Sequence, residues 1–295
     1  MLAAAPHPLP GGRRVSILNR QVAKQGPPEG RSSLMSSAAP PESPLDPSAN
    51  SLAASVDPTE VEKFSNLAES WWDPNGKFRP LHRLNPIRLG LIRDRAAARF
   101  GRDPLSPRPL AGLGLVDIGC GGGILAEPLA RLGARITGID AAEASIAAAR
   151  CHAAESELEI DYRLASAESL AETGARFEIV LAMEIVEHVA DVAAFLAAAG
   201  TLVAPGGLLI LSTLNRTAKS FALAILGAEY LLRWLPPGTH DWRRFLRPSE
   251  VAAALRPQGL TLHEAVGVVY SPLTDKWRLA GDDLDVNYMM GFGRD

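Results

Sequence analysis

A glycine-rich stretch directly after an apolar run marks the first candidate site. In "LVDIGCGGG", Gly119, Gly121 and Gly123 follow a strand-like run that contains Asp117. Glycine at such positions allows a sharp turn and lets the backbone approach a ligand closely. Asp140 ends the next apolar run, 21 positions after Gly119, where a carboxylate can accept hydrogen bonds from ribose hydroxyls. This arrangement predicts a binding site for a cofactor that contains a nucleoside.

The spacing of the glycines separates two candidate cofactors. The nicotinamide-dinucleotide fingerprint is G-x-G-x-x-G/A, and Ile124 occupies its third position here. Asp117 precedes the loop, and its negative charge would repel a pyrophosphate but would suit a ligand with an amino group. S-adenosylmethionine carries adenosine and a positively charged amino acid without phosphate. The pattern therefore favours S-adenosylmethionine over a nicotinamide cofactor, with a tight turn that binds no ligand as the structural alternative.

The stretch "MEIVEHV" holds the second group of candidate residues. Glu184, Glu187 and His188 have i, i+3, i+4 spacing, so they would share one face of a helical turn. Two carboxylates and an imidazole could hold a divalent cation that acidifies a bound hydroxyl group. His188 could instead act without a metal as a general base near neutral pH. A helix start with solvated acids and a packed histidine is the third alternative. Spacing alone leaves all three open, and His188 and Glu184 are the candidate catalytic residues.

Alternating strands and helices are expected to position both groups. Repeated βα units of this length predict a mostly parallel sheet with helices on both faces. Ligands bind at the carboxyl ends of the strands in such folds, and both candidate groups directly follow predicted strands. The predicted strands are 113–118, 134–139, 159–164, 177–182 and 207–213, and the helices between them are 124–132, 142–154 and 189–200.

The N-terminal segment differs from the rest of the chain. Residues 1–56 hold 9 of the 23 prolines and show no periodic apolar pattern, which predicts a disordered Pro/Ser/Ala-rich tail. Its basic residues also fit a mitochondrial targeting segment, although its early prolines would break a presequence helix. An over-long start, with Met35 as the initiator, is a further alternative. Residues 57–295 are expected to form the folded domain.

A helical cap is predicted over residues 57–101. Asp57 fits a helix N-cap, with Pro58 at the first helical position and Glu60 three residues after the cap, as in a capping box. A second helix is expected to start near Pro86.

Composition limits the class of protein. The formal net charge of −3 gives no overall attraction to nucleic acid, and none is expected as a partner. Two cysteines, Cys120 and Cys151, do not make a disulfide framework. No uninterrupted apolar run reaches about 18 residues, so no membrane span is expected. An apolar insertion at 218–241 is predicted either to dock on a membrane surface through about 219–235 or to form a buried lid helix.

Several stretches together resemble one enzyme family. "LVDIGCGGG" and "ITGID" resemble the first two motifs of class I S-adenosylmethionine-dependent methyltransferases. "FSNLAESWWDPNGKFRPLHRLNPIRLGLI", "MEIVEHV", "STLNRTAKSFALAILGAEYLLRWLPPGTHDWRRFLRP" and "DVNYM" resemble the ubiquinone-biosynthesis O-methyltransferases over about residues 61–290. The resemblance implies a Rossmann-like α/β fold with a mostly parallel seven-stranded sheet whose seventh strand is antiparallel at the edge. It also implies methyl transfer to phenolic oxygens of polyprenylated ubiquinone precursors, at both O-methylation steps.

The resemblance extends to site residues, partners and location. It implies S-adenosylmethionine binding by Arg88, Gly119, Asp140 and Met183, beside the Asp117, Gly121 and Gly123 of the loop, and magnesium at Glu184, Glu187 and His188. A polyprenylated phenol or quinol is the implied substrate, and other enzymes of ubiquinone synthesis are candidate partners. The expected location is cytoplasmic, peripheral on the inner face of the cell membrane, with the matrix side of the inner mitochondrial membrane as the alternative. A methyltransferase of small soluble phenols and a non-catalytic lipid-binding protein remain competing hypotheses.

Overall fold

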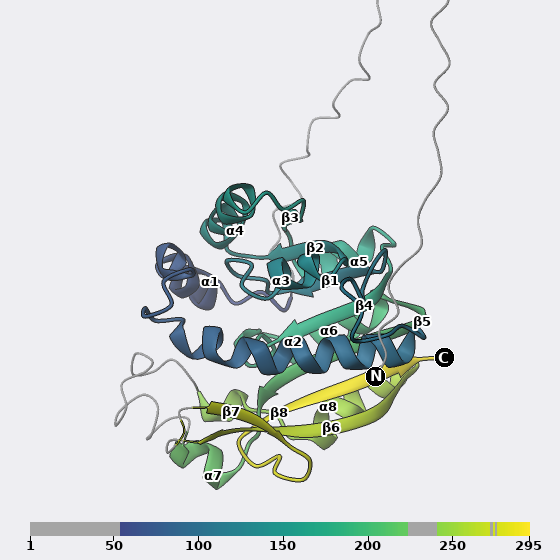
Figure 1. The fold of residues 1–295 in the computed structure, drawn as a ribbon. Helices are drawn as coiled ribbons and strands as arrows, with labels where there is room; N and C mark the ends of the chain where they lie inside the picture. Colours follow the sequence, from purple (N-terminus) through teal and green to yellow (C-terminus); the bar gives the residue numbers. More distant parts are fainter. Residues whose placement is uncertain (1–53, 224–240, 272–273, 275) are drawn as a thin grey trace, which may run out of the picture. The chain divides into compact units, whose positions relative to one another are not determined.

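The computed structural model describes residues 54–223, 241–271, 274 and 276–295, all within the unit Asn50–Asp295. Residues 1–53 of the predicted tail and residues 224–240 of the predicted insertion lie outside the described residues. An eight-stranded sheet in the order β3-β2-β1-β4-β5-β8-β6-β7 forms the centre of the described part (Figure 1).

The first five strands are parallel and confirm the five strands predicted from apolar runs. The other three form only antiparallel pairs, so β7 and β8 run against the first five strands and β6 runs with them, and the sheet has eight strands where seven were expected. The antiparallel strand β8 lies between β5 and β6, while β7 forms the edge, because β6 and β7 pair as a hairpin before the chain returns as β8. The strands are β1 (Gly114–Ile118), β2 (Arg135–Asp140), β3 (Asp161–Leu164), β4 (Phe177–Met183), β5 (Val203–Leu214), β6 (Leu260–Ser271), β7 (Lys276–Ala280) and β8 (Asn287–Arg294).

Helices cover both faces of the sheet, as the βα pattern predicts (Figure 1). In β4, Ile179 and Leu181 pack into the core on one face, and Val180 and Ala182 pack into the core on the other. Strand side chains alternate between faces, so a continuous apolar run buries both. Helices α2 (Arg79–Arg99), α3 (Ala126–Arg131) and α4 (Glu143–Glu155) contribute to the first core, and α5 (Ala167–Glu172), α6 (Val192–Thr201) and α8 (Pro248–Leu255) to the second.

The N-terminal cap consists of α1 (Pro58–Ser65), the 3-10 turn η2 (Ala68–Ser70) and α2. Asp57 is the N-cap of α1, as predicted, and accepts a hydrogen bond from Thr59 N at 3.0 Å. The predicted start of α2 near Pro86 is wrong, because the helix begins at Arg79 and contains Pro86 in its interior. Proline removes one backbone donor there, and the long helix tolerates that loss because its apolar side packs on the sheet.

Short turns connect the remaining elements: η3 (Val186–His188), α7 (Ala218–Ser220), η5 (Trp242–Arg244) and η6 (Arg256–Gln258). Within the described residues, no helix combines the length and hydropathy needed to cross a bilayer.

Candidate active site

The glycine loop follows β1 and is shaped by positive backbone dihedrals. Gly119, Gly121 and Gly123 have φ values of 73°, 52° and 84°. Close approach makes glycine necessary as well, since a Cβ at Gly121 would lie 2.4 Å from the ring of Trp71. The N–H of Gly119 donates to Ile139 O at 2.8 Å, which ties the loop to the end of β2. The conformation of the loop therefore depends both on its own glycines and on the N-terminal segment that contributes Trp71.

Two carboxyl groups flank the loop, with Asp117 buried and Asp140 partly buried. Asp140 accepts hydrogen bonds from Gly121 N at 2.9 Å and Ala142 N at 2.8 Å, one on each oxygen. Burial raises the pKa of Asp140, and these backbone hydrogen bonds partly oppose the rise. Burial also raises the pKa of Asp117 to about 7, with the charge of Arg88 lowering it and that of Asp140 raising it. A cationic group beside Asp117 would restore its charged form.

Arg88 reaches the site from α2 and is only 4% exposed. Its Nη2 lies 3.4 Å from Glu184 Oε1, and its Nε and Nη2 have no hydrogen-bond partner among the described residues. A buried guanidinium without hydrogen-bond partners destabilises the fold unless an anion pairs with it. The carboxylate of an amino-acid ligand would fit this position, and its amino group would fit Asp117. The donor set therefore suits S-adenosylmethionine.

One cavity of about 820 Å³ contains most of the predicted cofactor residues. Arg88, Asp117, Gly119, Asp140 and Met183 line it. The other two predicted loop glycines shape the turn and do not belong to the lining.

The predicted helical face of "MEIVEHV" is wrong. Glu184 directly follows β4 with φ 55°, in the left-handed region, and only Val186–His188 forms a turn. Ser212 holds Glu184 in this unusual conformation, because its backbone oxygen accepts from Glu184 N at 3.0 Å and its Oγ donates to Glu184 Oε1 at 2.7 Å. A non-glycine residue in this region stores backbone strain, which is typical of functional sites.

The three residues predicted as magnesium ligands turn to different partners. Glu187 is 4% exposed and accepts from Thr213 Oγ1 at 2.7 Å, and its burial raises its pKa to about 7. His188 Nδ1 lies 2.8 Å from Glu60 Oε2. Across the described ranges, no group of three or more His, Cys, Asp or Glu side chains could hold a metal ion together. As placed, Glu184, Glu187 and His188 do not fit a shared magnesium ion.

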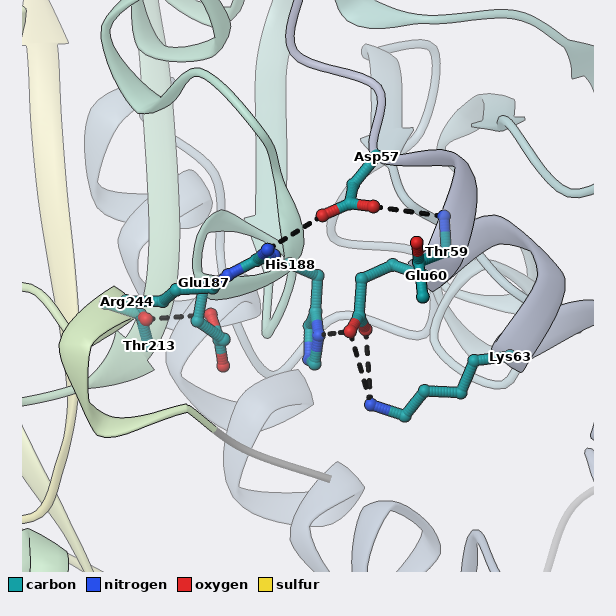
Figure 2. Close-up of polar contacts among 8 residues, drawn as sticks. All are labelled: Asp57, Thr59, Glu60, Lys63, Glu187, His188, Thr213 and Arg244. Carbon is teal, nitrogen blue, oxygen red and sulfur yellow. Dashed lines mark hydrogen bonds and ion pairs between the residues drawn. The ribbon is translucent and has the colours of Figure 1, made fainter. Parts of the chain in front are cut away.

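A network of charged side chains joins α1 to the turn that carries His188, after the end of β4 (Figure 2). Besides His188, Glu60 pairs with Lys63 Nζ at 3.2 Å, and Asp57 accepts from Arg244 Nη2 at 2.8 Å. Burial would raise the pKa of Glu60, but hydrogen bonds and charges from His188 and Lys63 outweigh it, so the pKa is lowered. Glu60 is thus a charged partner of His188 rather than half of the predicted capping box. The sequence offered no signal for this contact, since the two residues are 128 positions apart.

The folded part also begins earlier than predicted. Ser55, assigned to the tail, is 3% exposed; its N–H donates to Glu168 Oε1 at 3.1 Å and its carbonyl accepts from Ala190 N at 2.8 Å. Ser55 and Val56 line the cavity. Asn287, the first residue of β8, lines the cavity too and was not singled out from sequence.

Comparisons with known proteins agree with this geometry. The family model described as a methyltransferase domain matches residues 91–265. A ubiquinone biosynthesis O-methyltransferase of Mesorhizobium japonicum is 54% identical over 237 residues, covering 80% of this chain and 95% of the relative. One of Brucella anthropi is 54% identical over 235 residues, covering 80% and 94%.

Solved structures support the fold alone at their lower identities. Magnesium protoporphyrin IX methyltransferase of Synechocystis PCC 6803, with bound SAH, has a TM-score of 0.54 at 19% identity and covers 79% of this chain and 95% of its own. The plantazolicin methyltransferase BamL has a TM-score of 0.56 at 14% identity, covering 80% and 98%. The glycine loop and the buried ionic residues around it suit S-adenosylmethionine, and the close relatives are methyltransferases. These findings exclude the nicotinamide alternative. The chain belongs to the ubiquinone biosynthesis O-methyltransferase family of S-adenosylmethionine-dependent methyltransferases.

Proposed function

We propose that this protein methylates phenolic hydroxyls of polyprenylated ubiquinone precursors, at both O-methylation steps. The observation that carries the proposal is one continuous cavity, which extends from the glycine loop to an apolar region lined by β6, β7 and α2. A cofactor in the first half and a prenylated ring in the second would meet beside Met183 and His188. The names of the relatives supply the pathway.

Each residue that would hold S-adenosylmethionine contacts a different part of the cofactor. Arg88 would bind the carboxylate of its methionine part as a charge-assisted donor, and Asp117 would face its amino group. Asp140 would accept from the ribose hydroxyls with the lone pairs that Gly121 N and Ala142 N leave unused. The bound cofactor supplies a methyl group on a sulfonium sulfur, open to in-line displacement. The protein's part is to bring the phenolic oxygen into line with it.

The phenol must lose its proton for the displacement, because its ordinary pKa is near 10. His188 is the proposed base, and Glu60 orients it (Figure 2). With the carboxylate of Glu60 as acceptor, the proton of the neutral imidazole lies on Nδ1 and the lone pair on Nε2. Nε2 is then the atom that would take the phenolic proton. Because the lowered pKa of Glu60 keeps it charged, Glu60 also stabilises the imidazolium that forms.

Membrane docking is proposed for residues 219–235. The first residues of this segment, which the structure describes, support membrane docking because they expose apolar side chains: Phe221 is 42% exposed and Leu223 is 54% exposed. Leu223 also lines the cavity. A prenyl tail could then stay in the bilayer while the ring enters the site. The proposed location is the cytoplasmic face of the cell membrane, with the matrix side of the inner mitochondrial membrane as the alternative, and other enzymes of ubiquinone synthesis are proposed neighbours.

The test is methyl transfer from labelled S-adenosylmethionine to a short-tailed prenyl catechol, beside the unprenylated catechol and without either phenol. Preferred turnover of the prenylated compound is expected, because the second half of the cavity is apolar. Equal turnover of both catechols would favour a methyltransferase of small soluble phenols. Tight cofactor binding without any turnover would favour the non-catalytic hypothesis. A His188→Ala variant that binds the cofactor normally is the matched control for the chemical step.

A further inference from the structure

The second half of the cavity is an apolar wall that contains one buried amide. The wall comes from α2, β6 and β7, which lie beyond the strands that carry the cofactor residues, and its side chains suit an aromatic ring and hydrocarbon. It consists of Leu81, Leu84, Val268, Val269, Tyr270 and Trp277. Asn287 joins this wall as the first residue of β8.

Sheet register places Asn287 at the reacting edge. It pairs with Leu214 on β5 and with Val268 on β6, and directly opposite residues of an antiparallel pair share a face. Leu214 lies two residues beyond Ser212, whose hydroxyl holds Glu184. The Asn287 amide therefore lies between the apolar wall and the stretch that carries Glu184 and His188.

Asn287 is a buried amide whose oxygen is left unsatisfied by the part of the chain that the structure describes. The residue is 7% exposed, and its Oδ1 has no hydrogen-bond partner among the described residues. Buried polar groups are almost always hydrogen-bonded, so an exception requires an explanation. Asn85 and Asn215 also have an Oδ1 without a partner among the residues described. Their Nδ2 atoms, however, donate to Ile124 O at 2.9 Å and to Leu284 O at 2.8 Å, and neither residue lines the cavity.

A ring with two neighbouring oxygens would complete this amide. When one phenolic oxygen attacks the methyl group, an adjacent hydroxyl remains available as a hydrogen-bond donor to the amide oxygen. If the adjacent substituent is a methoxy group instead, the amide N–H can donate to it, because a carboxamide offers both a donor and an acceptor. A carboxylate or an apolar side chain would not accommodate both substituents.

We propose that Asn287 binds the oxygen substituent next to the methylated hydroxyl, and so selects catechols and their monomethyl ethers over monophenols. The inference rests on the proposed O-methylation and deepens it. One amide that accepts either neighbour explains how a single site could serve two methylation steps on differently substituted rings. Asn287 is a specificity residue, since it touches the substrate at an oxygen that does not react.

The test compares a prenyl catechol with the monophenol of the same tail. Asn287→Leu keeps the shape of the side chain and removes both hydrogen-bonding groups. Catechol KM is expected to rise by roughly 10- to 100-fold with kcat little changed, because the bond forms equally in the ground and transition states. KM for the monophenol is expected to stay within about threefold, and Kd for S-adenosylmethionine is expected to stay at the wild-type value.

Asn215→Leu is the matched control, since it removes an equally buried amide that lies off the cavity. It is expected to lower stability and leave the preference for catechol over monophenol unchanged. Asn287→Ser, a smaller polar variant, serves if the leucine variant does not fold, and its preference is expected to fall in the same direction. A preserved preference in a folded Asn287 variant would overturn the inference while the O-methyltransferase stands. Turnover of neither phenol by the wild type would overturn the proposed function itself.

Discussion

The raised pKa of Asp117 predicts how cofactor affinity depends on pH. Burial raises the pKa of this carboxyl to about 7. Without a ligand, Asp117 is therefore mostly protonated at pH 5.5 and mostly ionised at pH 7.5. The positively charged amino group of S-adenosylmethionine would favour the ionised form, so binding must first remove a proton at low pH. Affinity is expected to rise with pH across this window.

The magnitude follows from the two ionised fractions. With a pKa of about 7, roughly 3% of Asp117 is ionised at pH 5.5 and roughly 75% at pH 7.5, so Kd should fall about 25-fold, or about 2 kcal/mol. The window ends there because α-amino groups themselves lose a proton near pH 7.7 to 8.0. Titration calorimetry with S-adenosylhomocysteine, which keeps the amino acid part, would measure the change without turnover.

Two controls isolate Asp117 from the other ionisable groups. Asp117→Asn is expected to bind weakly at every pH in the window and to lose the slope. A ligand without the amino acid part, 5′-methylthioadenosine, is expected to bind the wild type with a Kd that changes little with pH. If the Asn variant kept the wild-type slope, or the wild type showed none, Asp117 would not face the amino group and the proposed orientation of the cofactor would be refuted.

Three further predictions concern catalysis, stability and metal. Glu60→Gln is expected to lower kcat by roughly 10- to 100-fold, because a charge-assisted hydrogen bond to His188 is worth about 1.5–3 kcal/mol. Steady-state kinetics would check this, with Glu62→Gln, at an exposed position on the same helix, as the control. An unchanged kcat would remove Glu60 from the mechanism. Glu187 has a folded-state pKa of about 7, above its ordinary 4.5, so ionisation destabilises the fold as pH rises through this interval and the full cost is present above it. Glu187→Gln should therefore raise the free energy of unfolding by up to about 3 kcal/mol at pH 8 and by less than about 1 kcal/mol at pH 5, as measured by urea titration; equal effects at both pH values would contradict this. EDTA is expected to leave Kd for S-adenosylmethionine unchanged, because the proposed cofactor-binding residues use no metal. Turnover measured in the same samples tests the magnesium prediction. If EDTA abolished turnover and only magnesium restored it, the three predicted ligands would have to come together when substrate binds.

The sequence predicted those features that depend on a few neighbouring residues. Apolar runs of strand length located the inner strands β1, β2, β4 and β5, because a parallel strand buried on both faces needs mostly apolar side chains; the edge strand β3 is exposed at three of its four positions. The loop after β1 was predictable because glycine is strongly favoured where φ is positive. Asp57 as a helix N-cap is equally local, since its carboxylate accepts from the N–H two residues later.

Elements decided by competing local preferences were predicted less well. The proline at 86 suggested the start of a helix, yet α2 runs through it because packing on the sheet outweighs one lost hydrogen bond. The spacing of Glu184, Glu187 and His188 suggested a shared helical face, but Glu184 leaves β4 with a left-handed conformation that Ser212 fixes. A helical spacing has no meaning at a position where the chain is not helical.

Only the tertiary structure decided how the site residues are paired and charged. Glu60 meets His188 across 128 positions, and Asn287 comes to the cavity because β8 inserts between β5 and β6. The pKa of Asp117 depends on burial beneath elements far away in the chain, together with the charge that α2 brings on Arg88. Residue types and spacing thus determined which cofactor chemistry the loop can support. Contacts between distant segments, and the water they exclude, determined which side chains carry charge, which remain unsatisfied and which can therefore act on a ligand.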